Sequence, residues 1–326
     1  MKRRAFIAFL GGATAWPLAA RAQGPALPVV GFLSNRTAAE SENVVAAFRQ
    51  GLGDSGYAEG HNVTIDYRLA EDQLDRLPGL AADLVRRPVS VIAATGGIAA
   101  AQAAKAATKT IPIVFANGTD PIKFGLVDNL ERPGQNITGV SLFAAAPGSK
   151  RLELLRELVP GNAPFAVLAD PSNADAATKA SDLQAAADAL GQPIEIVPVR
   201  SVQEFDAAFA GLVRRGVRAL LVSNEVLFTS HRDQVTALAA HHAIPAIYAY
   251  QELAAAGGLM SYGPSRSDGY RQCGIYVARI LKGEKPGDLP VRQPGKFELV
   301  INRKAAKAMG IEIPPALLGR ADDVIE

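Results

Sequence analysis

The sequence has few of the residues from which disulfides, metal centres and redox sites are built. Its 326 residues include one cysteine, Cys273, and four histidines. A single cysteine excludes an internal disulfide and a multi-cysteine zinc site, and so few histidines argue against a histidine-rich metal site. The phosphate-binding pattern G-x-x-x-x-G-K-[ST] is also missing. We therefore expect a protein that works without a metal or a cofactor.

No group of residues has the spacing of a catalytic site. His231 has Ser230 and Asp233 close by in the chain, but neighbours on one expected helix do not converge as a triad does. Cys273 falls inside an expected helix with no activating base beside it, which favours a packed thiol. The sequence therefore predicts a protein that is not an enzyme.

The first 22 residues have the composition of an export signal. They combine a basic start, an apolar middle and the small-x-small site Ala20-Arg21-Ala22, and they are too short and interrupted to span a membrane. Arg3-Arg4 resembles the twin-arginine signal, by which folded proteins are exported, and a general secretory signal is the alternative. We expect cleavage after Ala22 and a periplasmic mature protein.

The net positive charge of the chain belongs to this segment. It contains Lys2, Arg3, Arg4 and Arg21 and no acidic residue, so its removal changes the formal charge from +2 to −2. A mildly acidic chain without basic clusters is poorly suited to nucleic-acid binding.

The full chain is 48% hydrophobic, and its length accommodates two domains of about 150 residues each with proper cores. We expect a monomer.

After Pro28 the chain repeats one pattern of apolar strands and alanine-rich helices. The first set of strands is expected at 29–35, 62–68, 89–96 and 111–118, and the second at 165–173, 193–200, 217–224 and 244–251. The offsets of 136, 131, 128 and 133 residues between the sets indicate an internal duplication. Continuous apolar strands alternating with helices predict parallel sheets covered on both faces. We therefore predict an α/β protein with two similar doubly wound lobes joined by a hinge.

The tail adds elements beyond both repeats. A strand is expected at 259–263, a helix at 268–283 and a last strand at 297–302. Because they follow the repeats, we expect these elements to cross between lobes and to form part of the hinge. The predicted N-terminal lobe is 28–142 plus about 265–290, and the predicted C-terminal lobe is 143–264 plus about 291–326.

Small polar residues follow the apolar strands in both halves. In such sheets ligands bind outside the carboxyl ends of the strands, and two facing edges form a cleft. From the first half we expect Ser34, Asn35, Thr95, Gly96, Gly97, Asn117, Thr119 and Asp120 to line it. From the second half and the tail we expect Ser172, Asn173, Asn224, Glu225, Tyr250 and Tyr262.

Each of these candidates has a purely structural alternative. Gly96-Gly97 before a helix either presents N–H groups to a ligand carboxylate or simply turns the chain. Asp120 before a proline either pairs with a ligand ammonium or fixes its turn. Glu225 either pairs with the ammonium or lies solvated on the rim of the cleft. Tyr262 is the aromatic residue most expected to touch ligand, although strand aromatics are more often core.

Two longer motifs resemble those of a known family. DPIKFGLVDNLERPGQNITGVS at 120–141 and FELVINRKAAKAMGIEIPPALLGRADDVIE at 297–326 are similar to segments of bacterial ABC-transporter substrate-binding proteins. The subgroup is the one associated with tryptophan and tyrosine transport. The resemblance covers nearly the whole mature chain.

The resemblance implies a type I periplasmic binding fold with three crossovers between the lobes. It implies a ligand, best an aromatic amino acid or similar zwitterion, held in the cleft by hinge closure and delivered to a membrane permease coupled to an ATPase. The family's cleft segments fall on Ser34, 95–97, 117–120, 172–173 and Asn224, positions that the strand-end argument also selects. The segment around Asn136 and Thr138 is similar to a lobe-to-lobe crossing.

Other functions fit parts of the pattern. A periplasmic sensor that partners a receptor kinase or chemoreceptor would have the same cleft. A periplasmic enzyme would need a base in the cleft, for which Asp120 and Glu225 are the candidates. A repressor of the lac type would need a DNA-binding head where this chain has an export signal.

Overall fold

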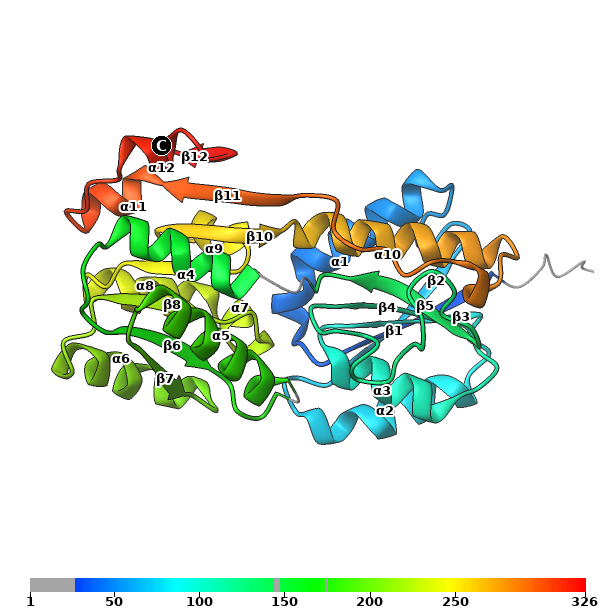
Figure 1. Cartoon of the computed structure of the whole chain (residues 1–326). Coiled ribbons are helices and arrows are strands. Elements are labelled where there is room, and N and C mark those ends of the chain that lie inside the picture. Colours follow the sequence, from blue (N-terminus) through cyan, green and yellow to red (C-terminus); the bar gives the residue numbers. More distant parts are fainter. Residues whose placement is uncertain (1–26, 144–146, 174) are drawn as a thin grey trace, which may run out of the picture.

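The computed structural model describes residues 27–143, 147–173 and 175–326, which form two α/β lobes side by side (Figure 1). Each lobe is built around one sheet with helices packed on its faces. The predicted export signal lies outside the described residues. Within those residues, no helix combines the length and apolar character needed to cross a membrane.

The sheet of the first lobe is entirely parallel, in the order β2-β1-β3-β4-β5. Its strands are β1 (Val29–Ser34), β2 (Thr64–Leu69), β3 (Val91–Thr95), β4 (Ile113–Asn117) and β5 (Ile137–Ser141). The helices that follow β1, β2 and β3 are α1 (Ala38–Asp54), η1 (Leu74–Arg76) with α2 (Leu77–Arg86), and α3 (Ile98–Ala107). β3, β4 and β5 are buried at every residue, as strands covered on both faces must be.

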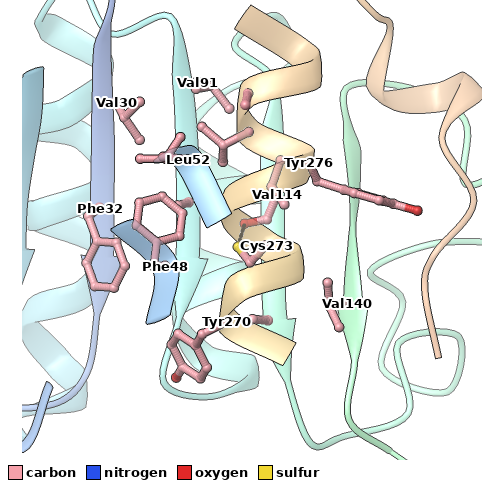
Figure 2. Close-up of a cluster of buried hydrophobic side chains, with 14 of the residues drawn as sticks. Val30, Phe32, Phe48, Leu52, Val91, Val114, Val140, Tyr270, Cys273 and Tyr276 are labelled. Atoms are coloured by element: carbon pink, nitrogen blue, oxygen red, sulfur yellow. Dashed lines mark hydrogen bonds between the residues drawn. The ribbon is translucent and has the colours of Figure 1, made fainter. Parts of the chain in front are cut away.

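A helix from the tail of the chain completes the core of this lobe. α10 (Arg266–Leu281) lies against α1 and covers the sheet. Its Tyr270, Cys273 and Tyr276 join Phe32 and Phe48 in one buried cluster (Figure 2). The Cys273 thiol is free and fully buried, as its position in an apolar helix face predicts.

The sheet of the second lobe has the order β12-β11-β10-β9-β8-β6-β7. Its strands are β6 (Phe165–Ala169), β7 (Ile194–Pro198), β8 (Ala219–Val222), β9 (Ala246–Tyr248), β10 (Met260–Pro264), β11 (Phe297–Asn302) and β12 (Asp323–Ile325). The helices are α4 (Pro147–Leu158), α5 (Ala176–Leu190), η2 (Val202–Glu204), α6 (Phe205–Arg214), α7 (Val226–Ser230), α8 (Arg232–His241), α9 (Gln251–Ala255), α11 (Arg303–Ala308) and α12 (Pro315–Leu318). β11 pairs antiparallel with β10, whereas the other neighbours are parallel.

The predicted α/β architecture with two parallel-sheet lobes is confirmed, with three additions. The sequence did not predict β5 as a strand, did not predict β12, and gave no sign that β11 runs antiparallel. The chain passes between the sheets after β5, again between β10 and α10, and finally between η3 (Pro286–Asp288) and β11. At β5, the Thr138 hydroxyl donates to the Leu289 carbonyl at 2.7 Å, which ties the first passage to the third.

Candidate ligand-binding cleft

The carboxyl ends of the strands in the two sheets face one another across a divided hollow. One compartment, the interlobe cavity, has a volume of about 40 Å³ and is lined by both lobes. A second, the apolar pocket, has a volume of about 130 Å³ and extends into the second lobe beside α4 and α5. Both are lined by Gly118, Leu142, Lys179, Asn224 and Tyr250, so they adjoin. A third, the outer hollow of about 360 Å³, opens near His231.

Most of the predicted site residues come together at these compartments. The interlobe cavity is lined by Gly96, Gly97, Asn117, Thr119, Asn173, Asn224, Glu225 and Tyr250. The outer hollow is lined by Asn35 and Ser172, together with Gly97 and Asn173. Ser34, Thr95, Asp120 and Tyr262 line none of the three hollows.

Each of those four has a structural contact instead. Ser34 Oγ accepts from the backbone N–H of Arg36 at 3.3 Å, and Thr95 Oγ1 lies 3.5 Å from the Leu33 carbonyl, to which it donates. Asp120 Oδ1 accepts from the N–H groups of the next turn at 2.9 and 3.1 Å, so its carboxylate fixes that turn. The Tyr262 ring packs 6.0 Å from that of Phe297 on β11.

Gly96 permits the close approach of two strand ends. Its φ of +84° lies in the left-handed region, and a Cβ there would stand 2.2 Å from Asn35 Oδ1. The backbone N–H of Gly96 donates to the Tyr270 hydroxyl at 3.2 Å. The turn before α3 is therefore held by the tail helix α10, which the sequence did not indicate.

Arg36 is a cleft residue that the strand-end rule missed by one position. Its side chain crosses between the lobes, and its guanidinium donates to Ser230 Oγ at 3.0 Å and to Thr229 Oγ1 at 3.1 Å. It is 4% exposed, and burial lowers its pKa, an effect that Tyr270 partly opposes. No carboxylate among the described residues forms an ion pair with it, and the hydrogen bonds of its guanidinium go to hydroxyl groups.

Arg266, at the start of α10, supplies a second buried guanidinium. It lines the interlobe cavity, pairs with Glu252 Oε1 at 3.3 Å and lies 5.4 Å from the centre of the Tyr250 ring. The nearby Arg266 charge further lowers the Arg36 pKa. One wall of the cavity therefore carries two positive groups.

The opposite charge comes from Glu225, which precedes α7. It is 2% exposed, and Lys179 Nζ lies 3.3 Å from its Oε1 and 2.9 Å from Asp175 Oδ2. Although burial alone lowers the pKa of Lys179, these two carboxylates raise it, so the lysine stays charged. The alternative of a solvated Glu225 on the rim is thus wrong, because this carboxylate is buried and paired.

A family model described as ABC transporter substrate binding protein matches residues 34–325 of this chain. The chain belongs to that family. It is therefore the substrate-binding component of an ABC transporter, a binding protein rather than an enzyme. Its small-molecule ligand and its permease partner follow from that role.

Relatives with this fold include proteins of known ligand. The tyrosine-binding protein of Clostridioides difficile (strain R20291) is 28% identical over 265 residues, which are 81% of this chain and 76% of that protein. An ABC domain from Streptococcus pneumoniae in complex with L-Trp is 27% identical with a TM-score of 0.82, covering 92% of this chain and all of that one. The ligand-free, open structure of an adhesive substrate-binding protein from Clostridium difficile is 26% identical with a TM-score of 0.66, covering 92% and 99%.

Several buried polar atoms of this binding protein point to what the cavity holds. Five such atoms have no hydrogen-bond partner among the described residues: Arg36 Nε, Arg266 Nη1, Asn117 Nδ2, Asn173 Oδ1 and Glu225 Oε2. All five residues line the interlobe cavity. Buried polar groups are normally paired, so the site suits a molecule with acceptors at one end and donors at the other.

One cluster at the outer hollow has potential metal ligands. Oxygen and nitrogen atoms of Glu40, Asp72 and His231 lie within 4.8 Å of one another. Glu40 and Asp72 belong to the first lobe, and His231 to the second. His231 Nδ1 lies 3.0 Å from the Leu227 carbonyl and donates to it, which turns Nε2 toward Glu40 at 3.5 Å. The cluster thus joins the two lobes at the edge of the cleft.

Proposed function

We propose that this protein carries an amino acid, best an aromatic one, in the periplasm and presents it to its ABC permease. The observation that carries the proposal is the pairing of opposite polar ends in the interlobe cavity. The guanidinium groups of Arg36 and Arg266 suit a ligand carboxylate. Glu225 Oε2 and Asn173 Oδ1 are acceptors for an ammonium group. Of the two candidate ammonium partners, Glu225 is favoured over Asp120, because the Asp120 carboxylate is occupied by its own turn.

An apolar side chain of the ligand has a matching compartment. The apolar pocket adjoins the interlobe cavity and is lined by Leu142, Phe143, Leu183, Leu221 and Tyr250. Such a pocket accepts an aromatic ring by burial of apolar surface. Relatives that bind tyrosine and tryptophan at 27–28% identity support this ligand class.

We further propose that the ligand is captured by hinge closure between an N-terminal lobe, 28–142 plus about 265–290, and a C-terminal lobe formed by the remainder. Hydrogen bonds that cross the cleft support a closed arrangement, among them that from Asn224 Nδ2 to the Gly118 carbonyl at 3.4 Å. The higher TM-score with the L-Trp complex than with the open structure agrees with it. A ligand favours closure through its higher affinity for that form.

The test is ligand binding by the mature protein, residues 23–326, after unfolding and refolding to strip bound molecules. Calorimetry and thermal shift are run with aromatic amino acids, other amino acids, aromatic acids, nucleosides and sugars. A ligand at 100 times its Kd adds about 2.7 kcal/mol of stability, a shift of several degrees for a chain of this size. We expect an aromatic amino acid to give that shift.

The matched variants are Arg36→Met and Arg86→Met. Arg36 is buried in the cleft, whereas the Arg86 side chain is 70% exposed on α2. Loss of a charged hydrogen bond to the ligand carboxylate is expected to weaken binding about tenfold or more in Arg36→Met and to leave Arg86→Met unchanged. If folded protein binds no amino acid in the panel, the proposed function is wrong.

A further inference from the structure

Arg151 is a buried cation without a counterion. It lies on α4, lines the apolar pocket and is 8% exposed. No carboxylate of the described residues forms an ion pair with its guanidinium, and its Nε has no hydrogen-bond partner among them. Burial lowers the pKa of Arg151, and the more distant Tyr250 and Glu225 only partly oppose this effect.

The other buried cations around the cleft are supported differently. Lys179 pairs with Glu225 and Asp175, and Arg266 pairs with Glu252. An isolated charge buried in an apolar environment is costly unless an opposite charge or several hydrogen bonds compensate it. Arg151 therefore lacks within the described chain what its neighbours have.

The walls of the pocket do not provide that compensation. Leu142, Phe143, Leu183, Leu221 and Pro264 are apolar. Asp182 is the one carboxylate among the described residues that line the pocket, and this exposed residue forms no ion pair with Arg151. A buried arginine with no ion pair among the described residues, set beside apolar walls, is the arrangement expected where a bound molecule supplies the anion.

We propose that Arg151 is a specificity residue for an acidic group at the far end of the ligand. The ligand class would be an acid with an apolar body and a second carboxylate, one end held by Arg36 and Arg266 and the other by Arg151. This inference rests on the proposed ligand site in the same cleft and refines its substrate class. A preference for a second carboxylate would distinguish the ligand of this chain from tryptophan, whose indole has no acidic group.

The experiment compares matched ligands by calorimetry on the mature protein. The first pair is 4-carboxyphenylalanine and phenylalanine, which differ in one carboxylate. The second pair, without an amine, is 3-(4-carboxyphenyl)propionate and 3-phenylpropionate. In each pair that binds, the wild-type protein is expected to prefer the member with the extra carboxylate by about tenfold or more.

The variants are Arg151→Met and, as control, Lys150→Met. Lys150 precedes Arg151 on α4 but is exposed and pairs with Glu153. Arg151→Met is expected to abolish the preference, chiefly by lowering the affinity for the member with the extra carboxylate, and Lys150→Met is expected to retain the preference. Ligand-free Arg151→Met should melt no lower than the wild type, because the uncompensated charge is gone.

The outcomes separate this inference from the proposed function. Preference in the amine-free pair alone would refute the amino-acid assignment and support the role of Arg151. Binding without preference, a preference that survives Arg151→Met, or no binding of any probe would overturn the inference. A lower melting temperature with a parallel loss of affinity for both members of a pair would show a structural role instead.

Discussion

At the scale of single residues, Asp72 shows how the cleft changes the chemistry of a side chain. It follows Glu71 in a turn where both residues have positive φ, 54° and 60°. Partial burial raises the pKa of Asp72 to about 6 from its ordinary 3.8, with Glu40 adding to the shift and His231 and Arg36 opposing it. Ionised Asp72 is therefore unfavourable in the folded protein.

This shift gives a pH dependence whose sign is fixed. The folded state binds the Asp72 proton more tightly than the unfolded state, so the cost of ionisation is fully present above pH 6 and disappears as the pH falls toward 3.8. Asp72→Asn is expected to raise the melting temperature by about 1–2 °C more at pH 7.5 than at pH 4. The effect is small because the side chain keeps contact with solvent, which screens its charge.

Melting curves of Asp72→Asn and of the neighbouring Glu71→Gln at both pH values provide the measurement. Asparagine tolerates the left-handed conformation, so the substitution adds no backbone strain at this position. An equal change at pH 4 and pH 7.5 would contradict the assignment of the shift to Asp72.

The sequence predicted site residues where the backbone itself carries them to the cleft. Asn117 ends β4 and Asn224 lies two residues beyond β8, and the rule that parallel strands end at one edge is sufficient to find them. Arg36, Lys179 and Arg266 were missed because long charged side chains are usually solvated, and nothing local marks those that turn inward. Only the packing of the two lobes makes them cavity residues.

At the scale of elements, the contact between α1 and α10 joins segments more than 200 residues apart, and glycines make it possible. A Cβ on Gly51 would stand 1.9 Å from the Arg271 carbonyl oxygen, and one on Gly274 would stand 2.2 Å from that of Phe48. The two helix backbones therefore touch directly, and this contact holds the tail helix over the first sheet.

Gly51→Ala and Gly53→Ala test this contact with two glycines on one helix. No atom lies within 4 Å of a Cβ at Gly53, whereas Gly51 faces backbone. Gly51→Ala is expected to lower the free energy of unfolding by about 1–3 kcal/mol through overpacking, and Gly53→Ala to raise it by up to about 1 kcal/mol through helix propensity. Urea unfolding measures both, and a neutral Gly51→Ala would show that α10 can shift.

The elements that sequence reasoning missed are those with weak local signals. β5 lies in the segment ERPGQNITGVS, where proline and glycine indicate loop, and its burial comes from β4 and the returning 289–292 segment. β12 has three residues and is a strand only because β11 offers it an edge. Tertiary contacts decide both.

At the scale of the whole molecule, Gly118 lies at a close contact between the two lobes beside the ligand site. It follows β4 of the first lobe, and a Cβ there would stand 2.9 Å from Asn224 Nδ2 and 3.0 Å from the Tyr250 hydroxyl of the second. Both distances are shorter than carbon normally tolerates. A side chain at this position would therefore have to displace the Asn224 amide and the Tyr250 hydroxyl before the lobes could reach this arrangement.

Gly118→Ala is expected to weaken ligand binding about tenfold or more while changing the melting temperature of the ligand-free protein little. The added methyl group opposes only the closed form, so the loss appears in affinity rather than in folding. Small-angle scattering with saturating ligand should show a larger radius of gyration than for the wild type. Gly79→Ala is the control, because Gly79 lies on α2 and a Cβ there would have no atom within 4 Å. Unchanged affinity in Gly118→Ala would refute the idea that a methyl group at this position opposes closure.

The return of α10 to the first lobe has a consequence for how the chain is made. The ribosome completes β1 to β5 long before it reaches residue 281, so the apolar face of α1 with Phe48 and Leu52 stays uncovered through more than a hundred further residues. The second sheet likewise waits for β11 and β12 at the very end of the chain. The first lobe therefore lacks part of its core until late in synthesis, and the second sheet is completed only by its last strands.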